Sequence, residues 1–315
     1  MARIDELIGP AKSIAIAGHL HPDGDCIGSC MGLYLYLKKN RPELSIDIFL
    51  EKPRDVFSYI SCISDAKTED LPDKVYDCYI SLDTSSEDRI GVATESFKKA
   101  KRRVCIDHHI TNPGLGDENV IEATASSASE VLYGLLDPEA LDLSIATALY
   151  TGIIHDCGVF QYSNTGKKTL EIAAKLIAMG IDFPTIIDKS FYERTYEQSR
   201  ILGHVLEHSR RYMKDQVCVG LVYPEDYKTF GIGKNDLDSI VSQLRLIKGV
   251  EVAVFLYPAK EGMFKVSLRA SGHVDVSAVA TVFGGGGHVK AAGCSLEGDP
   301  EEIIEKLLAE IKKQL

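Results

Sequence analysis

The feature that most constrains this chain is a series of short apolar runs that alternate with helical stretches and close on polar residues. Apolar runs of strand length lie at residues 13–17, 46–50, 79–82 and 104–106, and amphipathic stretches separate them. Strands that alternate with helices form a parallel sheet with helices on both faces. Ligands of such sheets bind at the carboxyl ends of the strands. Asp83 and Asp107 stand at such ends, and His19 follows one closely, so we predict an α/β fold with a site at this edge.

The pattern restarts in the last third of the chain. A helical stretch at 197–210 precedes three further apolar runs and a final amphipathic helix. A chain of 315 residues is long enough for two domains. We therefore predict a larger catalytic domain at 1–195, a linker helix at 196–212 and a smaller α+β domain at 213–315. The apolar side chains from Ile201 to Leu206 in the linker helix make a homodimer a reasonable hypothesis.

Charge and composition limit the partners. The formal net charge of −11 argues against a long basic groove for nucleic acid, although a local basic pocket remains compatible with it. The first residues lack the basic and apolar regions of a signal peptide, and the apolar runs are too short to span a bilayer. The eight cysteines contain no CxxC pair, which favours buried thiols in a reducing cytoplasm over a disulfide or metal framework.

Four polar clusters hold the side chains with the most obvious chemistry. Taken singly, they have ordinary structural explanations: a turn for the first, a helix N-cap for Asp83 and a helix end for the last. Together, in this order and each at the end of an apolar element, they point to one shared site. The clusters are the segment from His19 to Asp25 (HLHPDGD), Asp83, the tripeptide Asp107-His108-His109, and the pair His155-Asp156.

Carboxylates and imidazoles in one site indicate divalent metal binding. This donor set suits Mn²⁺, Fe²⁺, Zn²⁺ or Co²⁺. Several carboxylates in one cleft repel one another, and cations remove that repulsion. Two metal ions about 3.5–4 Å apart can share a carboxylate and activate a hydroxide for in-line attack on phosphorus. The sequence supplies enough ligands for two such ions.

These motifs together resemble the DHH phosphoesterase superfamily. The resemblance rests on His19-x-x-Pro22-Asp23-x-Asp25, Asp83, Asp107-His108-His109, and the segment from Asp156 to Thr165 (DCGVFQYSNT). The C-terminal part is similar to the associated DHHA1 domain through Arg269 and the run Gly284-Gly285-Gly286-Gly287-His288. The resemblance covers nearly the whole chain, and the size and domain order are similar to the nanoRNase and pAp-phosphatase branch.

The resemblance implies a role for each matched position. Asp25, Asp83, His108 and Asp156 would bind one metal ion, and His19, Asp23 and Asp83 would bind the other, with Asp83 as the bridge. The implied metal is Mn²⁺, with Mg²⁺ or Co²⁺ as substitutes. Asp107 would orient a ligand, and His109 would lie near the substrate phosphate. Cys157 and His21 depart from the family pattern, and His21 could compete with His19 as a ligand.

The glycine run has two interpretations. Glycines let backbone N–H groups approach an anion closely, so Gly284, Gly285, Gly286 and Gly287 could cradle a phosphate. Arg269 would then clamp the phosphate and His288 would contact it. The alternative is a flexible loop with Arg269 as an ordinary surface residue. The resemblance favours substrate binding.

The leading hypothesis for function is hydrolysis of very short RNA fragments (nanoRNA), of 3′-phosphoadenosine 5′-phosphate (pAp), or of both. A phosphodiesterase for cyclic or linear dinucleotides is the nearest alternative. A pyrophosphatase or exopolyphosphatase is disfavoured by the DHHA1-like part, and a nuclease for long single strands by the lack of a basic stripe. A metal-dependent nucleotide sensor is the non-enzymatic alternative, and it would fit an incomplete ligand set.

Overall fold

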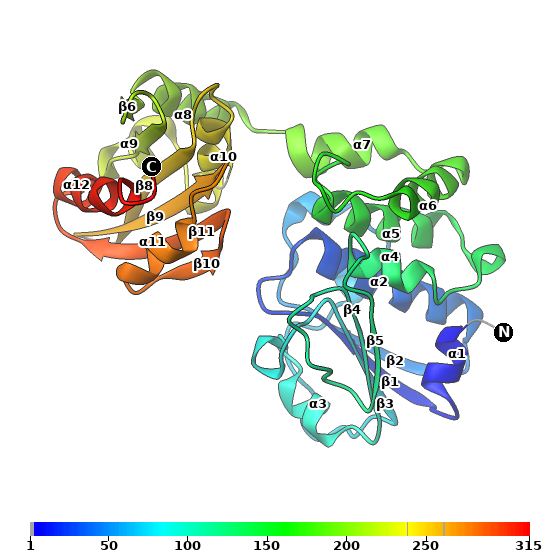
Figure 1. Ribbon diagram of the computed structural model, residues 1–315. Helices are drawn as coiled ribbons and strands as arrows, with labels where there is room; N and C mark the ends of the chain where they lie inside the picture. Colours follow the sequence, from blue (N-terminus) through cyan, green and yellow to red (C-terminus); the bar gives the residue numbers. More distant parts are fainter. Residues whose placement is uncertain (1–2, 238, 261) are drawn as a thin grey trace. The chain divides into compact units, whose positions relative to one another are not determined.

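The chain divides into two units, each built around its own sheet. The computed structural model describes every residue except 1–2, 238 and 261. Residues 1–193 form unit 1 and residues 194–315 form unit 2 (Figure 1). Among the residues that the structure describes, no helix has the length and apolar character needed to cross a membrane.

The sheet of unit 1 has five strands in the order β2-β1-β3-β4-β5, and every neighbouring pair is parallel. The predicted parallel sheet is therefore confirmed. The fifth strand was not predicted, because it lies at the sheet edge, where only Val120 is buried. The strands are β1 (Ser13–Ala17), β2 (Ser45–Phe49), β3 (Cys78–Leu82), β4 (Arg103–Asp107) and β5 (Glu118–Ile121).

Both faces of this sheet are buried. Ile14 and Ile16 of β1 belong to one hydrophobic core, and the alternate residues Ala15 and Ala17 belong to another, as the two-residue period of a strand requires. Helices therefore cover both faces, as predicted. The helices of unit 1 are α1 (Arg3–Ile8), α2 (Gly24–Asn40), α3 (Thr94–Lys99), α4 (Ala128–Tyr133), α5 (Leu143–Asp156), α6 (Lys167–Ala178) and α7 (Phe183–Ile187), the last followed by a π-helical turn (Asp188–Tyr192).

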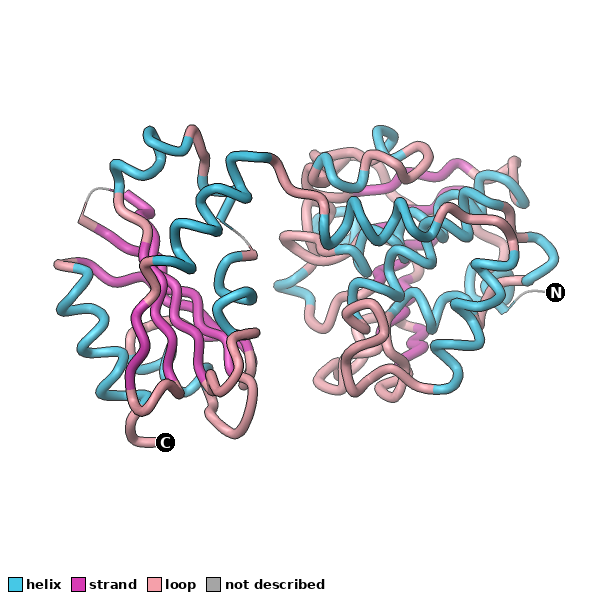
Figure 2. The backbone as a smooth tube through the Cα atoms, turned by 90° about the horizontal axis from the view of Figure 1, so that it is seen from above, coloured by secondary structure: helices cyan, strands magenta, loops and turns pink. Residues whose placement is uncertain are grey.

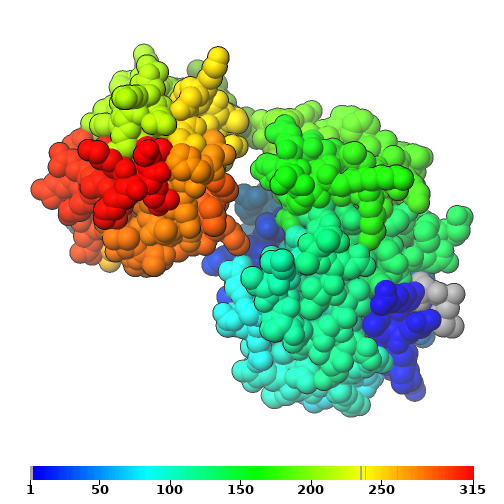
Figure 3. Space-filling view, viewed as in Figure 1, coloured from blue at the N-terminus to red at the C-terminus, as the bar shows by residue number. Residues whose placement is uncertain are grey.

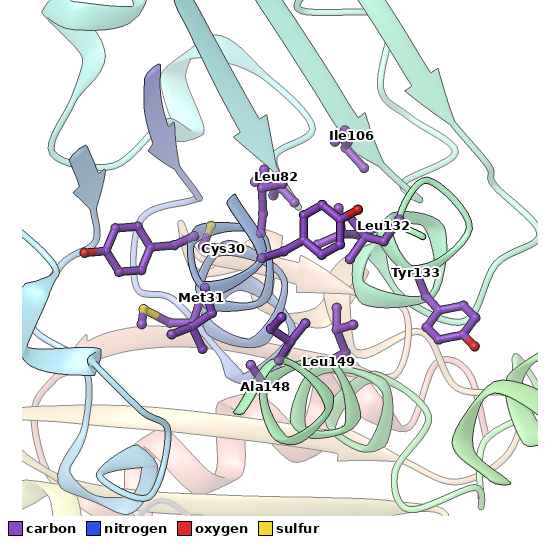
Figure 4. Packing of buried hydrophobic residues seen from close by; sticks show 14 of the residues in the cluster. Cys30, Met31, Leu82, Ile106, Leu132, Tyr133, Ala148 and Leu149 are labelled. Carbon is purple, nitrogen blue, oxygen red and sulfur yellow. The ribbon is translucent and has the colours of Figure 1, made fainter. Parts of the chain in front are cut away.

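Helix α2 is the central helix of unit 1. Its residues from Gly24 to Leu37 are all buried, because α2 packs between the strands and the helices α4 and α5. Figure 4 shows Cys30 and Met31 of α2 among Leu82, Leu132 and Leu149, which come from β3, α4 and α5. A surface helix exposes polar residues along its whole length. In α2, exposed polar residues occur only in the last turn.

Glycines bring α2 and α5 into backbone contact. A Cβ atom on Gly28 would lie 2.6 Å from the carbonyl oxygen of Ala148 and 2.6 Å from the amide nitrogen of Gly152. Glycine is therefore required at this crossing, since real Cβ atoms do not approach backbone atoms so closely. The close crossing matters for function because α2 begins near Asp25 and α5 ends at Asp156.

Unit 2 contains a six-stranded mixed sheet in the order β10-β11-β9-β8-β7-β6. Only the pair β7–β8 is parallel among these strands. Helices lie on both faces of the sheet (Figure 2). The strands are β6 (Arg210–Tyr212), β7 (Val217–Leu221), β8 (Val252–Lys260), β9 (Met263–Ala270), β10 (Gly286–His288) and β11 (Ala291–Glu297).

Of the stretch predicted as a linker helix at 196–212, residues 196–207 form α8, the first helix of unit 2, and residues 210–212 form strand β6 instead. Of the apolar side chains that suggested a homodimer, Ile201 and Val205 are buried in the core that covers one face of the sheet, whereas Leu206 is exposed. Helix α12 packs in the core of the other face, and its outer side lies on the surface (Figure 3). The helices are α8 (Tyr196–Glu207), α9 (Pro224–Phe230), α10 (Ile240–Arg245), α11 (Val276–Val282) and α12 (Pro300–Ile311).

Candidate metal centre

Three neighbouring strands and two helix ends deliver the polar residues of unit 1 to one place. Asp83 directly follows β3, Asp107 is the last residue of β4, and His19 comes two residues after β1. These strands are adjacent and parallel, so their carboxyl ends lie side by side. Asp25 comes from the first turn of α2 and Asp156 is the last residue of α5.

One group of candidate metal ligands surrounds the side chain of His108. Its Nε2 atom lies 3.0 Å from Asp156 Oδ2, 3.4 Å from Asp83 Oδ1 and 4.0 Å from Asp25 Oδ2. These are the residues that the family resemblance assigns to a single metal ion. Asp25, His108 and Asp156 together satisfy the spacing of a metal-binding group.

A second group lies on the other side of Asp83. His19 Nε2 is 3.4 Å from Asp83 Oδ2 and 3.8 Å from Asp23 Oδ1. The two carboxylate oxygens of Asp83 therefore face different histidines. Asp23 also caps α2, since its Oδ1 accepts hydrogen bonds from the backbone N–H groups of Asp25 and Cys26.

The thiol of Cys26 joins this second group, which the sequence did not reveal. His19, Cys26 and Asp83 place ligand atoms within 4.8 Å of one another. Cys26 is fully buried, and burial raises the pKa of its thiol well above the ordinary value. The thiol therefore stays protonated unless a cation displaces the proton.

Asp107 holds the two histidines that follow it. Its Oδ1 accepts hydrogen bonds from the backbone N–H of His108 and from His109 Nδ1, both at 2.8 Å. Its Oδ2 accepts a hydrogen bond of 2.5 Å from Asn112 Nδ2. Burial alone would raise the pKa of Asp107, but the hydrogen bonds from His109 and Asn112 outweigh it and lower the pKa. The sequence analysis did not identify Asn112. The only feature that could have pointed to it is its position three residues after His109.

Asp25 is held by the beginning of α4. Its side chain is fully buried, and its two oxygens accept hydrogen bonds from the backbone N–H groups of Ala128 and Ser129, at 2.6 and 3.0 Å. Burial and the nearby carboxylates of Asp83 and Asp156 raise the pKa of Asp25 well above its ordinary value. The Asp25 carboxylate is therefore costly to keep charged at this position unless a cation is close to it.

The chemistry of this cluster fits a divalent cation. Asp83 Oδ1 and His108 Nε2 are buried, and although acidic and imidazole atoms lie 3.0–3.4 Å from them, neither makes a well-directed hydrogen bond to the residues that the structure describes. A buried polar atom without a partner is costly, and a metal ion bound by these two atoms would satisfy both. Carboxylate and imidazole donors are the ligands that Mn²⁺, Fe²⁺, Zn²⁺ and Co²⁺ accept.

Two histidines from the predicted clusters lie outside the site. His21 has an exposed side chain that pairs with Glu51 at 3.0 Å, so it does not compete with His19. His155 packs against Phe57 and Phe191, with ring centroids 5.2 and 4.7 Å away. Burial lowers the pKa of His155 to about 4, so this ring is a neutral part of the core.

The residues predicted to bind substrate lie together on the sheet of unit 2. Arg269 of β9 and His288 of β10 are both paired with Ala291 of β11, which runs between them. Residues in register on adjacent strands face the same side, so Arg269 and His288 share a face about 10 Å apart.

The glycine run leads into this sheet. Gly284 adopts a φ of +72° after α11, and Gly286 and Gly287 form the start of β10. A Cβ atom on Gly287 would lie 2.4 Å from the carbonyl oxygen of Ala291. The run is therefore a turn and strand in which close backbone packing requires glycine at Gly285 and Gly287, while a Cβ atom on Gly286 would meet nothing within 4 Å. The exposed backbone of Gly286 and the exposed His288 ring lie at the surface of the unit.

Comparisons with known proteins agree with these motifs. The family model for the DHH family, N-terminal domain, matches residues 13–153, and that for the DHHA1 domain matches residues 215–315. The bifunctional oligoribonuclease and PAP phosphatase NrnA of Thermus thermophilus is 32% identical, covering 96% of this chain and 90% of the relative. The protein of the same description from Bacillus subtilis is 26% identical, covering 95% and 94%.

A solved structure has the same architecture over nearly the whole length. The crystal structure of an exopolyphosphatase-related protein from Bacteroides fragilis superimposes with a TM-score of 0.89 at 25% identity, covering 98% of this chain and 94% of that chain. The family models, the full-length relatives and the shared fold agree with one another. The chain therefore belongs to the DHH family of phosphoesterases and carries a C-terminal DHHA1 domain.

Proposed function

We propose that this protein hydrolyses phosphate esters in very short RNA fragments and in pAp, with two Mn²⁺ ions bound in unit 1. The observation that carries the proposal is the position of Asp83, whose Oδ1 faces His108 and whose Oδ2 faces His19. A carboxylate between two ligand groups is the arrangement that two-metal phosphoesterases use. The names of the full-length relatives support the choice of substrates.

The residues of the site have distinct tasks in this proposal. Asp25, Asp83, His108 and Asp156 hold one ion, and His19, Asp23 and Asp83 hold the other. The bound ions supply an activated water and positive charge next to the phosphoryl oxygens. Mg²⁺ or Co²⁺ would substitute for Mn²⁺, since both accept carboxylate ligands.

His109 and Asp107 act as a pair. Because the Asp107 carboxylate accepts the hydrogen bond, we assign the shared proton to His109 Nδ1. The hydrogen bond to Asp107 also raises the pKa of His109. In its protonated form, this partly exposed ring beside the cluster would stabilise negative charge on a phosphoryl oxygen.

Short substrates agree with the charge of the chain, whose formal net value is −11. In unit 2, Arg269 and His288 would bind a phosphate or base of the substrate, together with Gly284, Gly285, Gly286 and Gly287. The eight free cysteines, of which only Cys62 is exposed, agree with a cytoplasmic protein.

The substrate class is tested with a panel and the Mn²⁺-loaded protein. We expect turnover of a dinucleotide, a pentanucleotide RNA and pAp, with cyclic di-AMP and pyrophosphate left intact. The measurement is product formation by ion-pair chromatography. A preference for cyclic di-AMP or pyrophosphate would assign the protein to another branch of the family, and the absence of any turnover would favour a nucleotide sensor.

The role of unit 2 is tested by Arg269→Ala. We expect KM for a dinucleotide to rise about 10- to 100-fold, because a charge-assisted hydrogen bond contributes about 1.5–3 kcal/mol. Hydrolysis of bis-p-nitrophenyl phosphate, which lacks a nucleoside, should change much less. Lys265→Ala is the matched control, since it removes an exposed cation from the same strand. Equal KM values for the two variants would contradict the assignment of Arg269.

A further inference from the structure

The segment of residues 126–129, which leads into α4 and forms its start, contacts the candidate metal centre through backbone N–H groups. The amide groups of Ala128 and Ser129 donate hydrogen bonds to the two oxygens of Asp25. These two hydrogen bonds therefore fix the orientation of the Asp25 carboxylate. Any shift of the segment would move a ligand of the proposed site, even though no side chain of the segment belongs to the ligand groups described above.

Glu130 fixes one side of this segment. Its carboxylate is 2% exposed and accepts hydrogen bonds from the Ser126 hydroxyl and the Thr169 hydroxyl, both at 2.7 Å. It also accepts one from the backbone N–H of Ser126 at 3.3 Å, and Lys168 Nζ lies 4.0 Å away. Burying a carboxylate is costly unless its partners are well placed, so this arrangement holds Ser126 tightly to α4 and α6.

Asn164 fixes the other side of the same segment. Its Nδ2 donates hydrogen bonds to the backbone carbonyl of Ser126 at 3.0 Å and to that of Asp156 at 3.1 Å. One amide group therefore joins the segment that positions Asp25 to the residue that carries a second ligand. Ser126 is thus held by both residues. Its N–H and hydroxyl donate hydrogen bonds to Glu130, and its carbonyl accepts one from Asn164.

We propose that Glu130 and Asn164 are positioning residues that set the affinity of the metal centre by fixing Asp25 and Asp156 relative to each other. Neither side chain belongs to the ligand groups, and both act on them through the backbone of residues 126–129 and of Asp156. The inference rests on the metal binding in the proposed function. It adds two residues that would change the metal affinity without contacting the metal.

The test is a Mn²⁺ titration by isothermal calorimetry of the full-length wild type, Glu130→Gln and Asn164→Ala. We expect the dissociation constant to rise about 10- to 100-fold in both variants, the range found for residues that orient metal ligands. The increase in melting temperature on adding Mn²⁺ should shrink accordingly. Asn164→Asp, which keeps the size but cannot donate, should behave like Asn164→Ala.

The control is Asn40→Ala. Asn40 Nδ2 also donates to two backbone carbonyls, those of Tyr36 and Ala140, but at the far end of α2. This variant should lose stability without losing Mn²⁺ affinity. If Asn164→Ala also lowers the melting temperature but binds Mn²⁺ like the wild type, its role is structural and the proposal is wrong. Because Asn164 is exposed, we expect Asn164→Ala to fold, and it tests the proposal even if Glu130→Gln does not fold. A wild type that binds no Mn²⁺ would instead overturn the proposed function.

Discussion

Asp83→Asn is expected to lower kcat/KM by more than about 100-fold, since even residues that only orient metal ligands contribute 10- to 100-fold. Asp83 is 2% exposed and its oxygens face both His19 and His108. Asparagine keeps the shape but offers a single neutral oxygen, so one of the two ligand groups loses a donor. Calorimetric titration with Mn²⁺ should show weaker binding and reduced stoichiometry.

The same substitution should have the opposite effect on stability in the presence of EDTA. Asp83 raises the pKa of both Asp25 and Asp156, which means that these buried carboxylates repel one another. Removing one charge relieves that repulsion, so the melting temperature in EDTA should equal or exceed that of the wild type. Asp73→Asn, at an exposed position, should change neither activity nor Mn²⁺ binding. Wild-type activity in Asp83→Asn would refute the two-metal assignment.

Gly28→Ala is expected to lower the free energy of unfolding by about 1–3 kcal/mol or more, the range for overpacked cores. The added Cβ atom would meet backbone atoms of Ala148 and Gly152 at 2.6 Å, and backbone cannot rotate away as a side chain can. Helices α2 and α5 would have to separate, which would also displace Asp156 from His108. Urea denaturation followed by circular dichroism measures the loss.

A second glycine provides the comparison. Gly203 lies in α8, and a Cβ atom there would meet nothing within 4 Å. Gly203→Ala should therefore stabilise the protein by about 0.5–1 kcal/mol through the higher helix propensity of alanine. If both variants had the stability of the wild type, close packing of α2 on α5 would not be what requires Gly28.

The sequence predicted the parallel sheet of unit 1 and the strand-end positions of Asp83 and Asp107, because both follow from local patterns. Asn112, Cys26 and Glu130 were not found, and Asn164 stood only within the motif from Asp156 to Thr165, without a role. The roles of Glu130 and Asn164 depend on contacts across tens of residues, such as Glu130 with Thr169 and Asn164 with Ser126, and a single sequence does not show such contacts.

Neighbours in sequence can also mislead. His155 and Asp156 formed one predicted cluster, but successive residues on a helix point about 100° apart. Asp156 therefore faces His108 while His155 packs against Phe57 and Phe191. His21, two residues after His19, has a φ of +55° that turns the chain outward toward Glu51. In both cases, residues that are close in the sequence lie in different surroundings in the structure.

The continuity of unit 1 in the sequence has a consequence for biosynthesis. The proposed ligands from His19 to Asp156 and the proposed anchors at Asn164 and Thr169 all precede residue 194, where unit 2 begins. Domains generally fold as units, the N-terminal one first, while the ribosome is still translating. The nascent chain can therefore fold the proposed metal centre before the synthesis of the DHHA1 domain is complete.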